Sequence, residues 1–183
     1  MTEFINPTGI QKIRISEDNI QKKIILQDLD SGSRDFVLEV VIEGENSEVE
    51  ISGRAESQNS DQKKWEISLI LSGKNQTGKL DLRGISNDKG RLEFNGGGII
   101  SKNSSGGDID VSEKIVLFSK SAKGKNVPVL TVETEDLRSA SHSASMAPFE
   151  KEVFFFLESR GISQEEGKNL LREGFLGLKK CEE

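Results

Sequence analysis

The strongest constraint on the fold is a run of short segments in which polar and apolar residues alternate. From Gln11 to about Thr134, segments such as Phe36–Ile42, Trp65–Leu71 and Lys79–Arg83 place an apolar residue at every second position. This period is typical of β-strands that bury one face. Polar turns, such as the one at Asn46, separate the segments. The sequence therefore predicts an all-β body.

The number and spacing of the strands leave three architectures open: a β-sandwich, a β-barrel and a parallel β-helix. A weak internal repeat slightly favours the β-helix. Leu80–Gly84 and Leu92–Gly96 share an alternating pattern that ends in glycine, and they follow one another at a short, regular interval. In a β-helix each coil buries its inward side chains against the coils above and below, so stacking would supply the core.

The C-terminal part of the chain has a different period. Residues 149–178 carry apolar side chains at helical spacing, which predicts two helices. Gly161 suits the left-handed turn that ends the first helix, and Ser163–Glu166 forms a capping box that opens the second. We therefore expect a β-body over residues 1–137, followed over 138–183 by a junction loop and a helical hairpin. Phe154–Phe156 gives the first helix more apolar surface than one contact with the body would use.

Composition excludes several classes of function. The net charge is -6 and Lys and Arg are not gathered on one face, so nucleic acid is not an expected partner. The sequence has neither the apolar run of about 18 residues that a membrane span needs nor a signal peptide at its start. The single cysteine, Cys181, cannot form an internal disulfide, which agrees with a reducing compartment. We expect a cytoplasmic protein without a membrane partner.

His142 is the only histidine and lies in Ser139–Ser145, where the strands give way to the helices. A neutral imidazole could bind a metal or move a proton, and a purely structural or solvent-exposed role is the alternative. The sequence places no second histidine or cysteine nearby to complete a metal site.

Other candidate motifs favour ordinary structural roles. Gly96–Gly98 precedes an apolar strand and lacks the Lys-Ser/Thr of a phosphate-binding loop, so we expect a turn there. Asp108 and Asp110 share one strand face, which we interpret as outward polarity rather than as a catalytic pair. Lys179 and Lys180 would favour the thiolate of Cys181, but its position near the chain end favours an incidental thiol.

Several segments resemble the SufB/SufD family of iron-sulfur cluster assembly proteins. Pro128–Leu137 resembles the Pro-x-Leu-x-Ile strand of the family and the acidic pair that follows it, and Ser141–Ala144 stands for its Ser-His-Gly-Ala. Phe154–Ser163 is similar to Phe-Tyr-Leu-x-Ser-Arg-Gly-Ile-Ser, and Glu165–Phe175 to Glu-Glu-Ala-x-x-Leu-Leu-x-x-Gly-Phe. Upstream, Gly78–Ile85 resembles a recurring strand that ends in Arg-Gly-Ile.

The resemblance implies a right-handed parallel β-helix whose C-terminal helices dock on a SufC-like ABC ATPase. It places His142 on a family histidine that faces the partner subunit near the proposed site of cluster formation, which makes His142 a candidate cluster-interface residue and metal ligand. The implied ATPase-docking residues are Phe149, Val153, Phe154, Leu157, Arg160, Gly161, Leu171 and Phe175.

The chain departs from the family pattern in ways that narrow the expected role. It is less than half as long as the family proteins, and its β-body has no cysteine to match the sulfur-accepting thiol of SufB. Ser143 replaces the glycine after the histidine, and Gly167 replaces a helix-favouring alanine. We expect a SufD-like subunit that is not an enzyme and binds no cofactor stably, although it could share a transient iron-sulfur cluster with a partner.

The expected partners are the ATPase and, through the β-helix, a SufB-like subunit or a second copy of the chain. The alternative is a β-solenoid interaction module that has kept the family fold but handles neither iron nor sulfur.

Overall fold

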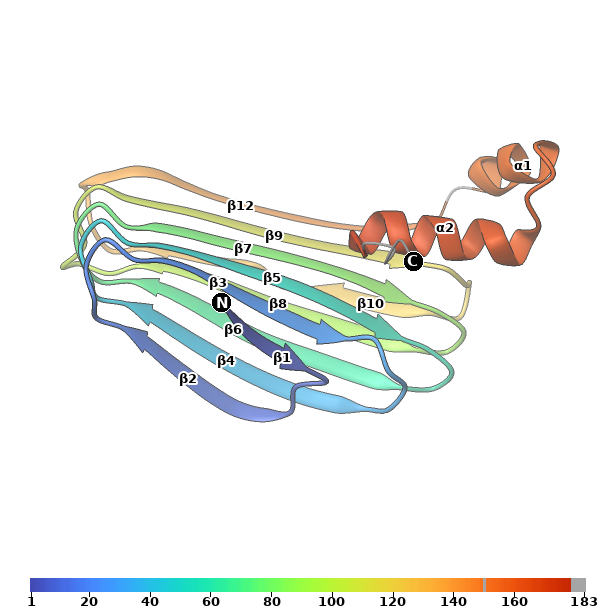
Figure 1. Cartoon of the computed structure of the whole chain (residues 1–183), viewed down its shortest axis with the longest axis horizontal. Helices are drawn as coiled ribbons and strands as arrows, with labels where there is room; N and C mark the ends of the chain where they lie inside the picture. The colour runs from blue at the N-terminus through green and yellow to red at the C-terminus, as the bar shows by residue number, and fades with distance from the viewer. Residues whose placement is uncertain (150, 179–183) are drawn as a thin grey trace.

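The computed structural model describes residues 1–149 and 151–178 and shows a parallel β-helix of about five turns followed by two helices, which confirms the predicted fold class (Figure 1). One sheet, sheet A, contains in order β1 (Thr2–Ile5), β3 (Gln21–Asp28), β5 (Glu48–Ser57), β7 (Thr77–Ser86), β9 (Gly107–Leu117) and β12 (Leu137–Pro148). Sheet B contains β10 (Lys123–Asn126), β8 (Arg91–Ile100), β6 (Gln62–Leu71), β4 (Arg34–Ile42) and β2 (Gly9–Ile15), and β11 (Val129–Val132) also pairs with β8. The helices are α1 (Lys151–Ser159) and α2 (Gln164–Leu176).

Successive coils stack in register, so that equivalent inward residues form rows along the molecule. In sheet A, one such row runs through Ile24, Ile51, Leu80, Val111 and His142, each beside the next. Four of these five residues are apolar and buried, which is the stacking that a β-helix needs for its core.

The true repeat of the chain is one complete coil. Register partners in adjacent coils are 27 positions apart at Lys12 and Glu39, and 31 positions apart at Asp110 and Ser141. The short interval between the two similar segments of the sequence is therefore not the structural repeat, because those segments lie on β7 and β8, in opposite sheets.

One corner of the β-helix is built from asparagines in the left-handed conformation. Asn19, Asn46 and Asn75 have φ angles of 57°, 53° and 52°, and Gly106 takes the equivalent place in the next coil with φ 63°. Asparagine and glycine tolerate this conformation better than other residues do. Each corner amide bonds to the next coil, as when Asn46 N–H donates to Lys74 O at 2.9 Å. The predicted turn at Asn46 is confirmed.

The core is formed by the inward side chains of both sheets. Phe36, Trp65 and Phe94 stack along the β-helix with ring centroids 6.4 Å and 5.6 Å apart, and all three rings are buried. The opposite sheet makes room for these rings with glycines, since a Cβ at Gly53 would lie 2.8 Å from the Trp65 ring. Stacked aromatic rings add to the hydrophobic stabilisation of the coils.

Gly96–Gly98 lies inside β8, so the expected turn at this position is wrong. Gly96 and Gly98 face the interior, where a Cβ would approach Glu113 Oε1 to 2.6 Å and Val111 Cγ2 to 2.9 Å. The run of glycines serves close packing between the sheets rather than a change of chain direction.

A buried ion pair lies next to the opposite corner. Lys63 Nζ is 2.6 Å from Asp28 Oδ1, and neither side chain is exposed to solvent. The same ammonium donates to the carbonyl oxygens of Asp28 and Asp30, and Arg34 Nη1 reaches Asp28 Oδ1 at 2.8 Å. A buried ammonium needs such partners because an unpaired charge in the interior is costly. The network ties the corner after β3 to two strands of sheet B.

Residues 138–148, expected to form most of a junction loop, belong to β12. The strand has the period of two, but its inward positions hold Ala140, His142, Ala144 and Met146. Small and polar side chains at these positions give only a weak alternation of apolar and polar residues. The expectation of a loop is wrong here because a strand at the end of a β-helix buries little of its inner face.

Candidate functional site

His142 lies at the open C-terminal end of the β-helix. β12 is the last strand of sheet A, and among the described residues it pairs in that sheet with β9 alone, so its other edge has no neighbouring strand there (Figure 1). The register places His142 directly beside the buried Val111, yet His142 itself is exposed. The strand therefore presents the imidazole where the next coil would otherwise lie.

Apolar side chains accompany His142 at this end of the molecule. Met146 on β12 is 51% exposed, and Val129 and Val132 on β11 are 51% and 42% exposed. An unpaired strand edge next to exposed apolar side chains is a ready surface for another protein.

Beneath this end lies Glu113, an inward residue of β9 with no exposed surface. Its Oε1 accepts a hydrogen bond from Gly96 N–H across the interior. Burial raises the pKa of the Glu113 carboxyl to about 7, while the hydrogen bond from the Gly96 backbone acts in the opposite direction. Glu113 lies among alternating residues and belongs to no motif, so the sequence alone does not indicate its position in the interior.

Among the residues that the structure describes, no set of metal ligands lies around His142. Within residues 1–149 and 151–178, no cluster of three or more His, Cys, Asp or Glu side chains could hold a metal ion. Asp110, on the outer face, accepts a hydrogen bond from Ser141 Oγ at 2.5 Å, consistent with the expected outward polarity. Cys181 lies outside the described residues.

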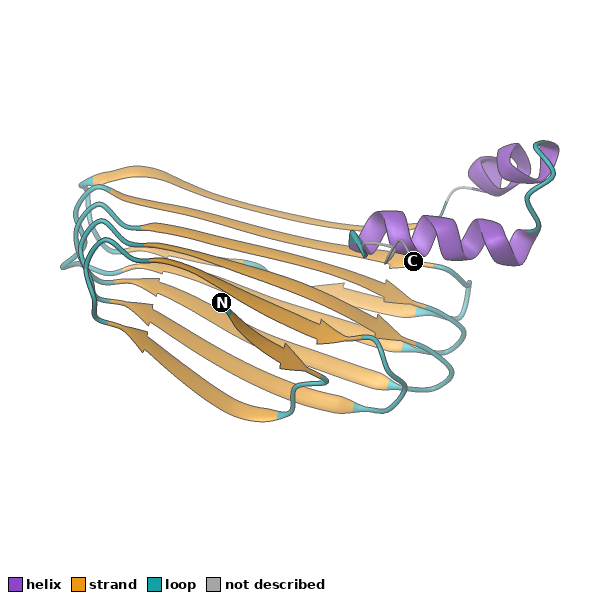
Figure 2. Ribbon diagram, viewed as in Figure 1, coloured by secondary structure: helices purple, strands orange, loops and turns teal. Residues whose placement is uncertain are grey.

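The helical hairpin has the caps that the sequence predicts. Gly161 has φ 81°, and Ser163 caps α2 with both halves of the capping box formed with Glu166. α2 lies beside the ends of the sheet A strands, and α1 projects beyond it (Figure 2).

The end of α2 is fastened to the outer face of sheet A by three arginine contacts. Arg54 Nε donates to Leu176 O at 2.7 Å, and Arg83 Nη1 donates to Phe175 O at 3.3 Å. Arg172 Nε donates to Glu56 Oε2 at 2.6 Å. Cations at the C-terminal carbonyls of a helix also complement its dipole. The hairpin is thereby held against the β-helix through α2.

The predicted docking residues differ in how much they offer a partner. Arg160 and Gly161 are exposed, and the other six are half-buried: Phe149, Val153, Phe154, Leu157, Leu171 and Phe175. Phe149 packs between Phe118 and Phe154, with ring centroids 5.0 Å and 5.6 Å away, so part of this set stabilises the hairpin itself.

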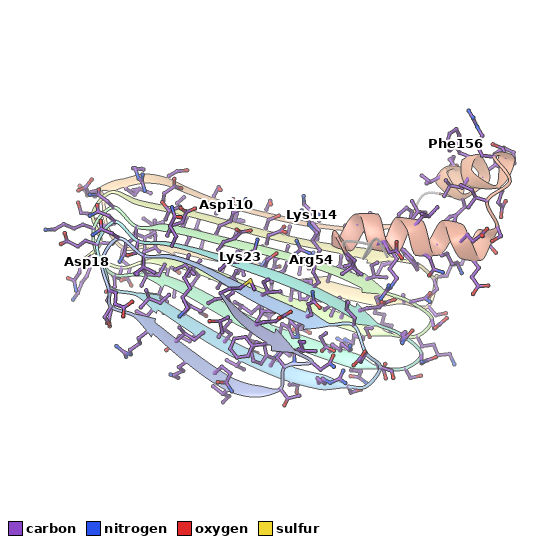
Figure 3. All side chains as sticks on the ribbon, viewed as in Figure 1. Asp18, Lys23, Arg54, Asp110, Lys114 and Phe156 are labelled. Atoms are coloured by element: carbon purple, nitrogen blue, oxygen red, sulfur yellow. The ribbon has the colours of Figure 1, made fainter. Side chains whose placement is uncertain are left out.

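The most exposed aromatic side chains lie outside the predicted docking set, in the Phe154–Phe156 run that was expected to leave apolar surface to spare. Phe155 and Phe156 are 75% and 56% exposed, and Leu170 on α2 is 44% exposed. The Arg160 guanidinium lies 5.3 Å from the centre of the Phe156 ring. Figure 3 shows Phe156 at the tip of the hairpin, away from the β-helix. Helical periodicity applied to the Phe154–Phe156 run would have separated these faces.

A groove of about 500 Å³ adjoins this surface. It is lined by Gly161, Ile162, Glu166, Asn169, Leu170 and Glu173. Exposed aromatic rings next to a groove with acidic walls suit a protein contact, because aromatic anchors dominate the energetics of many interfaces. Within the described part of the chain, neither helix has the length and apolar character required to cross a membrane.

Comparison with known proteins agrees with the resemblance seen in the sequence. The profile of the family described as "SUF system FeS cluster assembly, SufBD core domain" matches residues 20–175. The iron-sulfur cluster assembly protein SufD of Bacillus subtilis is 31% identical over 108 residues, which is 59% of this chain and 24% of that protein. SufD of Escherichia coli is 30% identical over 91 residues, which is 50% of this chain and 21% of that protein.

A SufBD family protein of Mycobacterium leprae is 35% identical over 68 residues, which is 37% of this chain and 17% of that protein. The matches thus span about a quarter or less of these relatives. Because the family profile covers most of the present sequence, the chain belongs to the SufBD core-domain family of iron-sulfur cluster assembly proteins.

Proposed function

We propose that the chain is a SufD-like subunit of an iron-sulfur cluster assembly complex. It binds a SufC-like ABC ATPase through its C-terminal helices and pairs through the end of its β-helix with a SufB-like subunit or a second copy. Family membership carries this proposal, and the relatives named SufD favour the SufD-like role.

The hairpin supports the ATPase contact. Phe155 and Phe156 are exposed on α1, while α2 is fastened to the β-helix by Arg54 and Arg172. Force applied to α1 would therefore reach sheet A through α2. ATP-driven motion of the ATPase would be transmitted by this route to the β-helix.

The open end supports the pairing contact. β12 offers a free strand edge, and His142 stands on its inward row at that edge. A cluster formed there would take its remaining ligands from the partner, since the β-body of this chain has no cysteine. His142 would then ligate iron or move a proton at the shared interface.

Co-purification with an ABC ATPase of the SufC type from the same genome tests the first contact. We expect Phe155→Ala/Phe156→Ala to weaken binding at least about tenfold, because exposed aromatic anchors commonly contribute this much. Ile10→Ala removes a comparably exposed side chain from β2 and should leave binding unchanged. Failure of the unaltered chain to bind, or equal binding by both variants, would exclude this docking surface.

The absence of cysteine from the β-body favours a second candidate function, a β-solenoid interaction module that handles neither iron nor sulfur. Anaerobic reconstitution with iron and sulfide, in the presence of a SufB-like partner, distinguishes the two. A visible absorption band that is lost in His142→Ala supports the assembly role. No band with either chain, while the complex still forms, supports the interaction module.

A further inference from the structure

Two buried oxygens at the open end of the β-helix have no hydrogen-bond partner among the described residues: Glu113 Oε2 and Asn126 Oδ1. Buried polar atoms are seldom left unpaired, because the loss of hydration is not repaid. Two such atoms in one coil therefore call for a common explanation.

The two side chains lie on facing elements at a break in sheet B: a Cβ at Gly124, two positions before Asn126, would lie 2.9 Å from Ile115, two positions after Glu113. β10 ends at Asn126 and β11 begins at Val129, so the ladder with β8 is interrupted opposite Gly96. Gly96 N–H donates instead to Glu113 Oε1. Val127, the residue after Asn126, donates its N–H to Phe94 O at 2.9 Å. Glu113 thus lies at the break from which the Asn126 side chain projects inward.

Asn126 connects the same break to β12. Its position beside the buried Phe94 places the side chain in the interior, and its Nδ2 donates to Ser145 O on β12 at 2.8 Å. Because a carbonyl oxygen can only accept, the amide must direct its NH2 group toward β12. Its Oδ1 is then left to accept a hydrogen bond.

We propose that Glu113 and Asn126 form a proton-dependent latch for β12. In its protonated form, Glu113 donates from Oε2 to Asn126 Oδ1, and Asn126 in turn donates to Ser145 O. When Glu113 ionises, it becomes an acceptor only, so the amide turns its NH2 group toward the carboxylate and Ser145 O loses its partner. Glu113 is thereby a positioning residue for the strand that carries His142.

The surroundings of Glu113 favour the protonated form. Leu82 on β7 and Ala144 on β12 are its neighbours in the register, and neither can carry charge. Lys125 on β10 points outward and pairs with Glu93 at 2.9 Å. On β12, His142 is the titratable residue of the inward row. Burial raises the pKa of Glu113 to about 7, so the latch would open and close near neutral pH.

Hydrogen exchange of the peptide that covers β12 tests the latch. The whole chain is compared at about pH 6 and about pH 8, with rates corrected for the intrinsic effect of pH. We expect protection of β12 to fall about fivefold at the higher pH, as for the loss of one hydrogen bond. Glu113→Gln, which keeps an acceptor and a donor in place, should remain protected at both pH values.

Two further variants complete the test. Glu93→Gln removes a carboxylate from the outer face of the adjacent β8 and should keep the pH dependence of the unaltered chain. Asn126→Ala should lose protection of β12 at the lower pH and show no further loss at the higher one. The latch is refuted if β12 protection in the unaltered chain does not depend on pH, or if that dependence survives in Asn126→Ala.

The importance of the latch for pairing rests on the proposed function, but the exchange measurement does not. It monitors β12 in the free chain, whether or not the chain pairs. Sedimentation at the same two pH values then reports on pairing separately. A chain that stays monomeric alone and with a SufB-like partner would contradict the pairing proposal, while the exchange data still decide the latch.

Discussion

Among single residues, the charged side chains inside the β-helix are the ones that the alternating pattern fails to predict. Lys63, Asp28 and Glu113 all occupy interior positions without appreciable exposed surface. Period two correctly places most apolar residues inside, because the hydrophobic effect selects them. It cannot show that a lysine at the start of a strand finds a buried carboxylate in the preceding coil, since that contact depends on how the coils stack.

Glu113 makes stability depend on pH. Its pKa is raised from an ordinary 4.5 to about 7, so between these values the folded chain holds a proton that the unfolded chain releases. The free energy of unfolding should therefore decrease as pH rises from about 4.5 to about 7, by up to about 3 kcal/mol, and stay level above that range. Urea denaturation across this range measures the effect.

Glu113→Gln cannot ionise and should remove most of this decrease, whereas Glu93→Gln on the outer face should retain it. Equal pH profiles for the unaltered chain and Glu113→Gln would show that folding does not raise the pKa of the Glu113 carboxyl.

Among the helices and strands, those with a signal in their own sequence could be predicted, and those positioned by distant residues could not. The capping box at Ser163 and the left-handed Gly161 are signals contained within a few residues, and both helices follow from them. β12 was missed because its inward row of Ala140, His142 and Ala144 lacks strongly apolar side chains. The docked position of α2 depends on arginines of β5 and β7, which are distant in the sequence and which no local signal indicates.

The arginine contacts should control whether α2 stays on the β-helix. Arg54→Met/Arg172→Met removes donors to Leu176 O and Glu56 while keeping much of the side-chain length. We expect α2 to lose protection from hydrogen exchange by about tenfold or more, with the β-helix strands unchanged.

Lys114→Met is the matched control, because Lys114 lies beside Arg83 in the same outward row and makes no hydrogen bond to α2 within the described residues. Unchanged protection of α2 in the double variant would mean that apolar contacts around Leu176 hold the helix alone.

At the scale of the whole molecule, alternation predicts the strand content but not the way the strands connect. Sandwiches, barrels and β-helices share the same alternation, and the pairing partners lie a complete coil apart in the sequence, beyond any local pattern. The β-helix was predicted from the resemblance of the C-terminal segments to the family, and the strand order and register confirm that prediction.

Pairing through the open end should be sensitive to charge on the inward row of β12. Ala144→Arg places a bulky cation at an exposed position of this row, and we expect it to abolish the paired species in sedimentation, alone or with a SufB-like partner. Ile10→Arg at the other end of the β-helix should still pair. Loss of pairing in Ile10→Arg but not in Ala144→Arg would show that the contact uses the opposite end.

The coils contain more residues toward the C-terminus. Register partners are 27 positions apart at Lys12 and Glu39 and 31 positions apart at Asp110 and Ser141. The strands of sheet A lengthen as well, from 8 residues in β3 to 12 in β12. The two open ends therefore have different outlines. Two copies stacked head to tail would join a broad end to a narrow one. Two copies that meet through the same end have matching outlines, because a two-fold axis relates them. This taper works against the filaments that exposed strand edges otherwise encourage.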